Sequence, residues 1–207
     1  MRDSSLEQGS VPEQEFLGVA GELLSVRPFA SVSMADVAEA ARVSMSELES
    51  RFPDMTSIGD AVLDRERFSM RQVMDQLRAE PLTSSQKLIR AFEGVGANLR
   101  FDPVVRAGVR IAAESRDYFP HRRLDPFATW QAFVVDLLES ATTAGELRIS
   151  AELDEAARVL VAAGMGTKDL IAFHGTWETA PAQMASTARI IVGYMSRIEL
   201  STGEDRP

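Results

Sequence analysis

The stretch Ser31–Leu63, SVSMADVAEAARVSMSELESRFPDMTSIGDAVL, decides the fold of this chain. Ser33 is followed by Asp36 after three residues, and Ser44 is followed by Glu47 at the same spacing. This spacing marks a helix N-terminus, because the cap hydroxyl accepts a hydrogen bond from a backbone N–H one turn later. Only two residues separate the two short predicted helices, so a sharp turn joins them. Two helices, a tight turn and a third helix are the layout of a helix-turn-helix, whose second helix normally enters the major groove of DNA.

The apolar residues recur at helical spacing over most of the chain, and no segment predicts a strand. Asp-Pro pairs at 102–103 and 125–126 predict helix starts, and Gly145 and Gly175 predict helix ends. The sequence therefore predicts an all-α protein of about nine helices. Outside the helix-turn-helix, helices are predicted from Pro12 onward, over 56–78, from 84 or 85 onward, and over 103–114, 125–144, 154–174 and 181–200.

The pattern around the helix-turn-helix is specific enough to suggest a family. The matching features are the lead-in PFASVS at 28–33, ADVAEAA at 35–41, Val43-Ser44, Leu48, Phe52 and AVL at 61–63. In these features the chain resembles the TetR family of ligand-responsive transcriptional repressors. The resemblance implies an N-terminal helix-turn-helix domain, a helical ligand-binding and dimerisation domain, and three partners: operator DNA, a small molecule and a second copy of the chain.

The departures from the family pattern lie on the side of the second helix that would face DNA. Met45 stands where the family usually has Lys, Glu49 where it has Tyr, and Arg51 where it often has His. Met55 replaces a Lys that commonly follows at the start of the next helix. A Glu can accept a hydrogen bond from cytosine N4, but it needs basic neighbours beside the phosphates. The positions that the resemblance assigns to DNA contact are Ser33, Ser44, Met45, Ser46, Glu49 and Arg51.

Charge is distributed unevenly along the chain, whose formal net charge is −9. Residues 1–60 hold four basic and eleven acidic side chains, and residues 61–207 hold eighteen basic and twenty acidic ones. The predicted DNA-binding region therefore carries most of the excess negative charge, whereas nucleic-acid-binding domains are usually basic. Two interpretations remain open. In the first, the helix-turn-helix domain still binds DNA; in the second, the helix-turn-helix is retained but has lost DNA binding.

The remaining composition limits the function classes. With no cysteine, disulfides, thiolate catalysis and cysteine-based zinc sites are all excluded, and the two histidines show no metal-ligand spacing. No apolar run is long enough for a membrane span, and the polar N-terminus predicts no signal peptide, so we expect a cytoplasmic protein without a cofactor. The expected domains are a disordered lead at 1–11, the helix-turn-helix domain at 12–58, the ligand-binding and dimerisation domain at 59–200, and a disordered tail at 201–207.

Short motifs in the C-terminal part extend the resemblance to the γ-butyrolactone receptor branch of the TetR family. They are VVRAGVR at 104–110, PFATW at 126–130 and GMGT at 164–167. The resemblance implies that Trp130 lines the ligand cavity and that Thr167 donates a hydrogen bond to a lactone-like ligand. Glu66 is the nearest match to a family Gln that helps to bind ligand. Phe92, Met165 and Phe173 are further candidates for the cavity wall.

Each of these candidates also has a purely structural interpretation. Trp130 lies among other apolar side chains and could simply be part of the core, and the Thr167 hydroxyl could donate to the carbonyl four residues earlier. The two last helices are apolar over much of their surface, and the resemblance implies that they form a four-helix bundle with the same helices of a second copy.

A second function class is an enzyme or ligand-binding partner protein that uses the former effector cavity and no longer binds DNA. The enzyme version needs a general acid or base in the cavity. The candidates are Glu66, Glu114, Asp136 and His174, and the sequence does not rank them. A carboxylate with a perturbed pKa buried beside Trp130 would favour this alternative.

Overall fold

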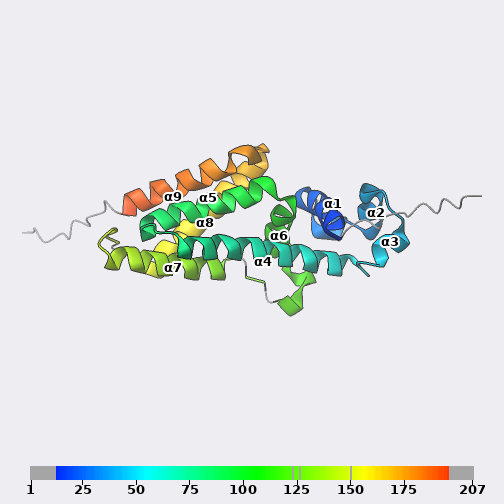
Figure 1. Cartoon of the computed structure of the whole chain (residues 1–207), viewed down its shortest axis with the longest axis horizontal. Coiled ribbons are helices and arrows are strands. Elements are labelled where there is room, and N and C mark those ends of the chain that lie inside the picture. The colour runs from blue at the N-terminus through cyan, green and yellow to red at the C-terminus, as the bar shows by residue number, and fades with distance from the viewer. Residues whose placement is uncertain (1–12, 123, 126, 150, 196–207) are drawn as a thin grey trace, which may run out of the picture. The chain divides into compact units, whose positions relative to one another are not determined.

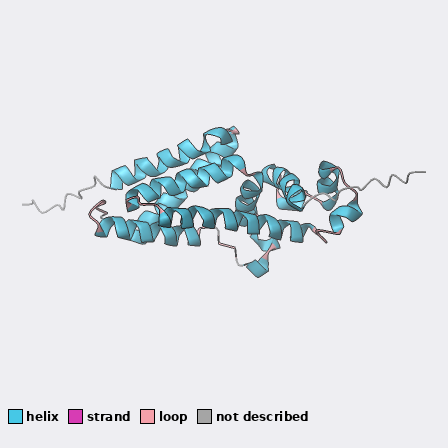
Figure 2. Cartoon of the chain, viewed as in Figure 1, coloured by secondary structure: helices cyan, strands magenta, loops and turns pink. Residues whose placement is uncertain are grey.

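The computed structural model describes residues 13–122, 124–125, 127–149 and 151–195, and in these residues it contains nine α-helices and no strand (Figures 1 and 2). The prediction of an all-α protein with about nine helices is therefore confirmed. The predicted lead at 1–11, the tail at 201–207 and the end of the last helix lie outside the described residues. The helices are α1 Glu13–Val26, α2 Met34–Ala41, α3 Met45–Glu49, α4 Met55–Ala79, α5 Ser84–Phe101, α6 Pro103–Glu114, α7 Ala128–Thr143, α8 Leu153–His174 and α9 Ala180–Met195.

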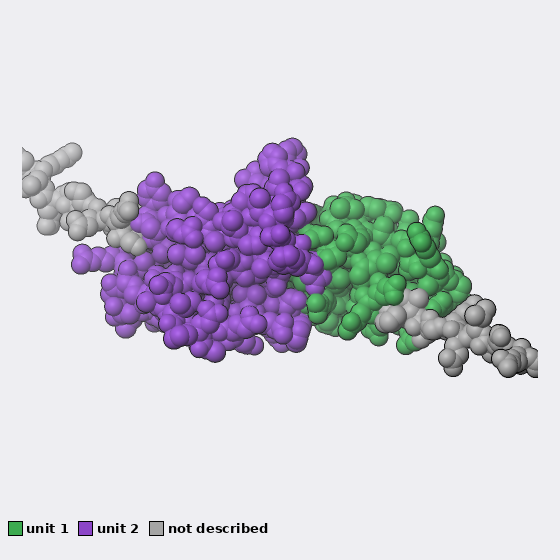
Figure 3. Space-filling view, turned by 45° about the horizontal axis from the view of Figure 1, so that its top comes forward, with its two compact units in different colours: residues 1–66, 103–123 green, residues 67–102, 124–207 purple. Residues whose placement is uncertain are grey.

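The chain divides into two compact units that are not contiguous in sequence (Figure 3). The first unit consists of residues 1–66 and 103–123, and the second of residues 67–102 and 124–207. This division differs from the expected domain boundary at residue 58. Helix α4 begins in the first unit and continues into the second, and α6 packs with the N-terminal helices although it follows them by many residues.

The first unit is built on close packing between α1 and α6. A Cβ atom on Gly21 of α1 would lie 2.8 Å from the Cα atom of Val104 in α6, so the two backbones meet where there is no side chain between them. Phe16, Leu24 and Ile111 are fully buried in this unit. The aromatic ring of Phe29 packs edge-on against that of Phe119, with their centroids 5.0 Å apart. This core supports the helix-turn-helix.

Some helix ends in the structure are set by capping residues that the sequence contains. Thr83 caps α5, which begins at Ser84 as predicted, and forms a capping box with Gln86. Helix α7 begins later than the Asp-Pro pair at 125–126 predicted, at Ala128. The Asp125 side chain still accepts hydrogen bonds from the backbone N–H groups of Phe127 and Ala128, each at 3.0 Å, so it satisfies two donors at the entry to the helix.

The second unit has one apolar core to which α4, α5, α7, α8 and α9 contribute. The largest fully buried side chains of this core are Leu88, Leu138, Leu160 and Ile171. Gly96 of α5 allows a close crossing with α9, because a Cβ atom there would lie 2.6 Å from the carbonyl oxygen of Ala180. No helix among the described residues has the length and apolarity that a membrane crossing requires.

Candidate functional sites

The helix-turn-helix consists of α2 and α3 and the turn between them. Ser33 and Asp36 form a complete capping box at the start of α2, and the Ser44 hydroxyl accepts from the backbone N–H of Glu47 at the start of α3. Arg42 ends α2 in the left-handed conformation, with φ 58°, which is the sharp turn that the two-residue link requires. Leu48 of α3 is fully buried. Both capping predictions and the turn are confirmed by this geometry.

Asp36 is the electrostatic centre of this motif. Its carboxylate accepts from the hydroxyl and the backbone N–H of Ser33, and its other oxygen lies 3.1 Å from the Arg27 guanidinium. The Ser33 hydroxyl is the largest cause, followed by the Ser33 backbone and Arg27, and together they lower the pKa of Asp36 from 3.8 to about 2. Arg27 also donates to the carbonyl of Ser31. Arg27 is therefore engaged within the motif.

All six residues predicted to face DNA lie on the exposed surface of the first unit. Within α3, Met45, Ser46 and Glu49 are exposed, while Leu48 points into the core. Arg51 follows α3 and is also exposed. The structure thus leaves all six predicted residues accessible to solvent, but whether they contact DNA stays a prediction. The exposed side is poor in cations, as the sequence indicated.

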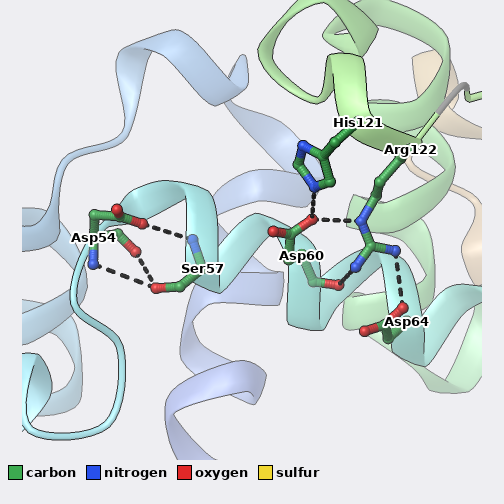
Figure 4. A network of polar contacts seen from close by, with 6 residues as sticks. All are labelled: Asp54, Ser57, Asp60, Asp64, His121 and Arg122. Atoms are coloured by element: carbon green, nitrogen blue, oxygen red, sulfur yellow. Dashed lines mark hydrogen bonds and ion pairs between the residues drawn. The ribbon is translucent and has the colours of Figure 1, made fainter.

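A polar network that the sequence analysis did not identify fixes the first turns of α4 (Figure 4). Arg122 donates from Nε to Asp60 and from Nη1 to Asp64 Oδ1 at 2.8 Å, and it also donates to the Asp60 carbonyl at 3.0 Å. The Nε2 atom of His121 lies 3.1 Å from Asp60. Hydrogen bonding to Asp64 is the main cause that raises the pKa of Arg122 further, so this clamp keeps its charge. It holds the segment after α6 against α4.

Two of the ligand candidates belong to the core of the second unit, and a third lies half-buried in the same unit. Trp130 of α7 is partly buried against the core, and its ring meets Phe133 edge-on at a centroid distance of 5.8 Å. Phe92 of α5 is buried and packs on Gly164 of α8, where an added Cβ atom would lie 2.7 Å from its ring. Met165 of α8 is half-buried. Trp130 and Phe92 thus lie in or against the same core.

Thr167 has two hydrogen-bond partners in the structure. Its hydroxyl donates to the carbonyl of Ala163 at 2.9 Å, four residues earlier, and lies 2.8 Å from the hydroxyl of Thr187 in α9. The structural interpretation of Thr167 is therefore confirmed. A hydroxyl has a single hydrogen, which here is donated to Ala163, so donation to a ligand requires the hydroxyl to rotate away from that carbonyl. The predicted ligand contact therefore stays a prediction.

The other site candidates lie elsewhere. Phe173 is 83% exposed at the end of α8, so it does not share the interior that holds Phe92. Glu66 is half-buried and belongs to the first unit, whereas the other five ligand candidates belong to the second. The remaining catalytic candidates, Glu114, Asp136 and His174, are all exposed.

The displaced carboxyl pKa values also give no support to a catalytic site beside Trp130. Among the described residues, a second carboxyl group with a displaced pKa, besides Asp36, is Glu146. Partial burial opposes the shift, but hydrogen bonds from Ser85 and Ser84 lower the pKa of Glu146. Glu146 thus caps the N-terminus of α5, which is a structural role. The enzyme alternative is therefore not favoured.

An apolar stripe runs along the exposed side of α8. Positions 159, 163, 166, 170 and 173 follow one another at alternating spacings of four and three residues, the repeat of a helix that packs against another helix. Val159 is 45% and Leu170 is 59% exposed. On α9, Ile190 and Tyr194 are also exposed, at 56% and 66%. We call these exposed positions of the two helices the α8–α9 face.

The sequence did not predict the Arg122 clamp on Asp60 and Asp64, nor the capping of α5 by Glu146. Both depend on contacts between residues about sixty positions apart. Arg122 stands in the sequence beside another arginine in a loop, which gave no reason to prefer it over a solvated charge. The one available signal was the pair Asp60 and Asp64, whose spacing puts two carboxylates on one side of a helix. That pattern indicates a cation partner without identifying it.

Comparison with known proteins adds the family context of the fold. No protein-family model and no curated protein matches the sequence. Among solved structures, a γ-butyrolactone receptor described as ArpA-like is similar, with a TM-score of 0.71 at 21% identity over 88% of this chain and 96% of that one. The TetR-family protein CprB from Streptomyces coelicolor A3(2) gives a TM-score of 0.73 at 22% identity, over 89% of each chain.

CprB in complex with its biological operator sequence is also similar, with a TM-score of 0.68 at 20% identity over 87% of this chain and 96% of that one. At these identities the likeness establishes the fold alone. The chain therefore has the fold of TetR-family regulators, with an N-terminal helix-turn-helix and a helical C-terminal part, and it resembles the γ-butyrolactone receptor branch.

Proposed function

We propose that the protein is a ligand-responsive transcriptional regulator of the TetR type that binds operator DNA as a homodimer. The observation that carries this proposal is the intact helix-turn-helix, in which both caps, the left-handed turn at Arg42 and the buried Leu48 are kept. The exposed residues of α3 are then free to enter a major groove. The similar structure of CprB with its operator supports the same use of the fold. Operator binding implies a location in the cytoplasm.

The α8–α9 face is the proposed dimer interface. Large apolar side chains such as Leu170 and Phe173 lose the hydrophobic free energy of burial while they are exposed to water. Their seven-residue repeat matches a second helix, and Gly166 within the stripe would let that helix approach closely. A two-fold dimer would present two helix-turn-helix motifs to two half-sites of an operator.

The proposed effector is a small lactone-like molecule that binds beside Trp130 and Thr167 in the second unit. The likeness to a γ-butyrolactone receptor supports this class of ligand. Phe92 and Met165 would supply apolar contacts, while Thr167 would supply a polar one. The ligand controls DNA binding only if it favours one conformation of the dimer over another.

The first test is fluorescence anisotropy of a labelled duplex from the DNA upstream of the gene, titrated with full-length protein. The regulator proposal predicts sequence-selective binding that weakens as salt is added. A folded dimer that binds neither this duplex nor random DNA at low salt would overturn it. Leu170→Glu should convert the dimer to monomers in sedimentation and abolish operator binding. Phe68→Glu, at an exposed phenylalanine of α4 that lies in the second unit and outside the α8–α9 face, is the matched control and should change neither.

The ligand is tested with a γ-butyrolactone that carries an alkyl chain. The protein has two tryptophans, so a Trp177→Phe variant reports on Trp130 alone. We expect saturable quenching in this variant and none in Trp130→Phe. Thr167→Val should weaken binding about two- to tenfold, the range for one hydrogen bond. Thr187→Val removes the same Thr–Thr contact but keeps the Thr167 hydroxyl, so it should bind normally. Equal binding by all variants would contradict the proposed site.

A further inference from the structure

The exposed surface of the helix-turn-helix contains an unusual set of charges for a DNA-reading motif. Residues 33–54 contain five carboxylates and two arginines; these are Asp36, Glu39, Glu47, Glu49, Asp54, Arg42 and Arg51. Asp36 forms the capping box of α2 and an ion pair, and Asp54 caps the start of α4 by accepting from the backbone N–H of Ser57 at 2.8 Å. Glu47 is half-buried, so Glu39 and Glu49 remain as exposed carboxylates on the two helices of the motif.

Glu49 occupies the side of α3 that is directed away from the core. It lies one turn after Met45, and both side chains are exposed, while Leu48 between them is fully buried. Residues four apart lie on one side of a helix. A second helix that docks in the major groove by its exposed side therefore brings Glu49 to the edges of the bases.

The chemistry of the groove restricts what a carboxylate can accept there. A carboxylate beside phosphates is repelled unless a base donor compensates it. Cytosine presents its N4 amino group as a donor in the major groove. Adenine also presents an amino group, but the acceptor N7 lies next to it and repels a carboxylate, while guanine and thymine present acceptors. Of the four bases, cytosine alone satisfies Glu49 without an adjacent acceptor.

We propose that Glu49 is a specificity-determining residue that selects cytosine in the operator, and that the helix-turn-helix anchors to phosphates through no more than Arg42 and Arg51. This inference rests on the proposed operator binding. Arg42 is exposed at the turn and, among the ion pairs between described residues, joins none. Arg27 is already held by Asp36. The protein thus gains little from phosphates and depends on base contacts for its affinity.

Because few cations contact phosphates, DNA binding should depend only weakly on salt concentration. Each neutralised phosphate contributes about −0.9 to the slope of the logarithm of the DNA-binding constant against the logarithm of the salt concentration. Two arginines in the helix-turn-helix of each of two protomers therefore give a slope of about −4 or shallower. Repulsion by Glu39 and Glu49 reduces non-specific binding further. The ratio of the affinity for operator DNA to the affinity for random DNA should therefore be large, although the affinity for the operator itself is modest.

The test compares wild-type protein with Glu49→Gln and with Glu39→Gln as a matched control that removes the same charge from an exposed position of α2. Each protein selects duplexes from a randomised library, and anisotropy between about 50 and 200 mM salt gives the slope. Circular dichroism confirms that each variant is folded. Wild type and Glu39→Gln should enrich the same cytosine-containing sites. Glu49→Gln should bind random DNA more tightly and lose about tenfold of its preference at one base pair in each half-site.

Three outcomes overturn the proposal in distinguishable ways. If none of the three proteins binds any DNA at low salt, operator binding itself fails, and the inference fails with it. If DNA binds but Glu49→Gln enriches the same sites as Glu39→Gln, then Glu49 does not read a base while the regulator proposal stands. If the wild-type slope is clearly steeper than about −4, cations outside the helix-turn-helix anchor the DNA and the phosphate-poor part is wrong.

Discussion

The helix-turn-helix and the α8–α9 face follow the same rule for buried residues and differ in what they expose. Leu48 in α3 and Ile171 in α8 are both fully buried at the positions that helical spacing predicts. The exposed side of α3 carries Met45 and Glu49, whereas the exposed side of α8 carries large apolar side chains such as Leu170. The buried residues therefore specify which fold forms, and the exposed residues specify which partner each surface accepts.

The largest effect on stability should come from the buried side of the helix-turn-helix. Leu48→Ala removes a fully buried side chain and leaves a cavity, so it should lower the free energy of unfolding by about 2–5 kcal/mol. Met45→Ala on the exposed side of the same helix should change it by no more than about 0.5 kcal/mol. Urea denaturation followed by circular dichroism measures both values. Similar losses in the two variants would contradict the assignment of the two sides of α3.

A smaller effect is expected where α1 meets α6. Gly21→Ala introduces a Cβ atom 2.8 Å from the Val104 backbone, so it should cost about 1–3 kcal/mol of stability. Gly18→Ala lies one turn earlier, and its Cβ atom would have no neighbour within 4 Å. Because alanine favours a helix over glycine, this control should gain about 0.5–1 kcal/mol. Thermal unfolding of both variants tests the pair, and destabilisation by Gly18→Ala would indicate that α1 packs differently.

Much of the fold was predictable because it depends on local signals. The capping serines at 33 and 44, the short link between them and the helical apolar spacing each act within a few residues. They predicted the all-helical class and the helix-turn-helix. The division into two units was not predictable in the same way, because α6 joins the first unit through packing against α1 across a long stretch of sequence.

The functional surfaces were predictable only in part. The family resemblance assigned Met45, Ser46 and Glu49 to the side of α3 that faces DNA, and all three are exposed in the structure. The clamp of Arg122 on Asp60 was not predictable, because it joins residues that only the folded chain brings together. Thr167 shows the intermediate case. Its bond to the previous turn follows from local geometry, but its contact with Thr187 depends on how α8 and α9 pack.

A substitution of Arg42 should change stability and DNA binding in opposite directions. A non-glycine residue in the left-handed conformation is strained, so Arg42→Gly should stabilise the protein by up to about 1 kcal/mol. The same change removes one of the two proposed phosphate contacts of each head. Operator affinity should therefore fall, and the salt slope should become shallower by about 2 for a dimer. Unfolding curves and anisotropy on the same preparation measure the two effects, and an unchanged slope would exclude Arg42 from phosphate contact.

The smallest expected effect concerns the pH dependence of the exposed capping box at Asp36. The folded state lowers the pKa of Asp36 from 3.8 to about 2, so the folded state holds this proton less tightly than the unfolded chain. The stabilisation is therefore fully present above the ordinary value and is lost as the pH falls towards 2. The difference in unfolding free energy between wild type and Asp36→Asn should shrink over this range. A difference that stays constant down to the lower pH would contradict the role of the carboxylate.

Two further variants identify which neighbour holds the Asp36 carboxylate. The hydrogen bond from the Ser33 hydroxyl is the largest cause of the lowered pKa, ahead of Arg27, so Ser33→Ala should raise the pKa of Asp36 more than Arg27→Gln does. A carbon-detected NMR titration of the Asp36 carboxyl group measures both shifts. The opposite order would mean that the ion pair dominates, and Arg27 would then be the residue that holds the start of α2. Because Arg27 is one of the few cations near this motif, the outcome also decides how firmly it is withheld from DNA.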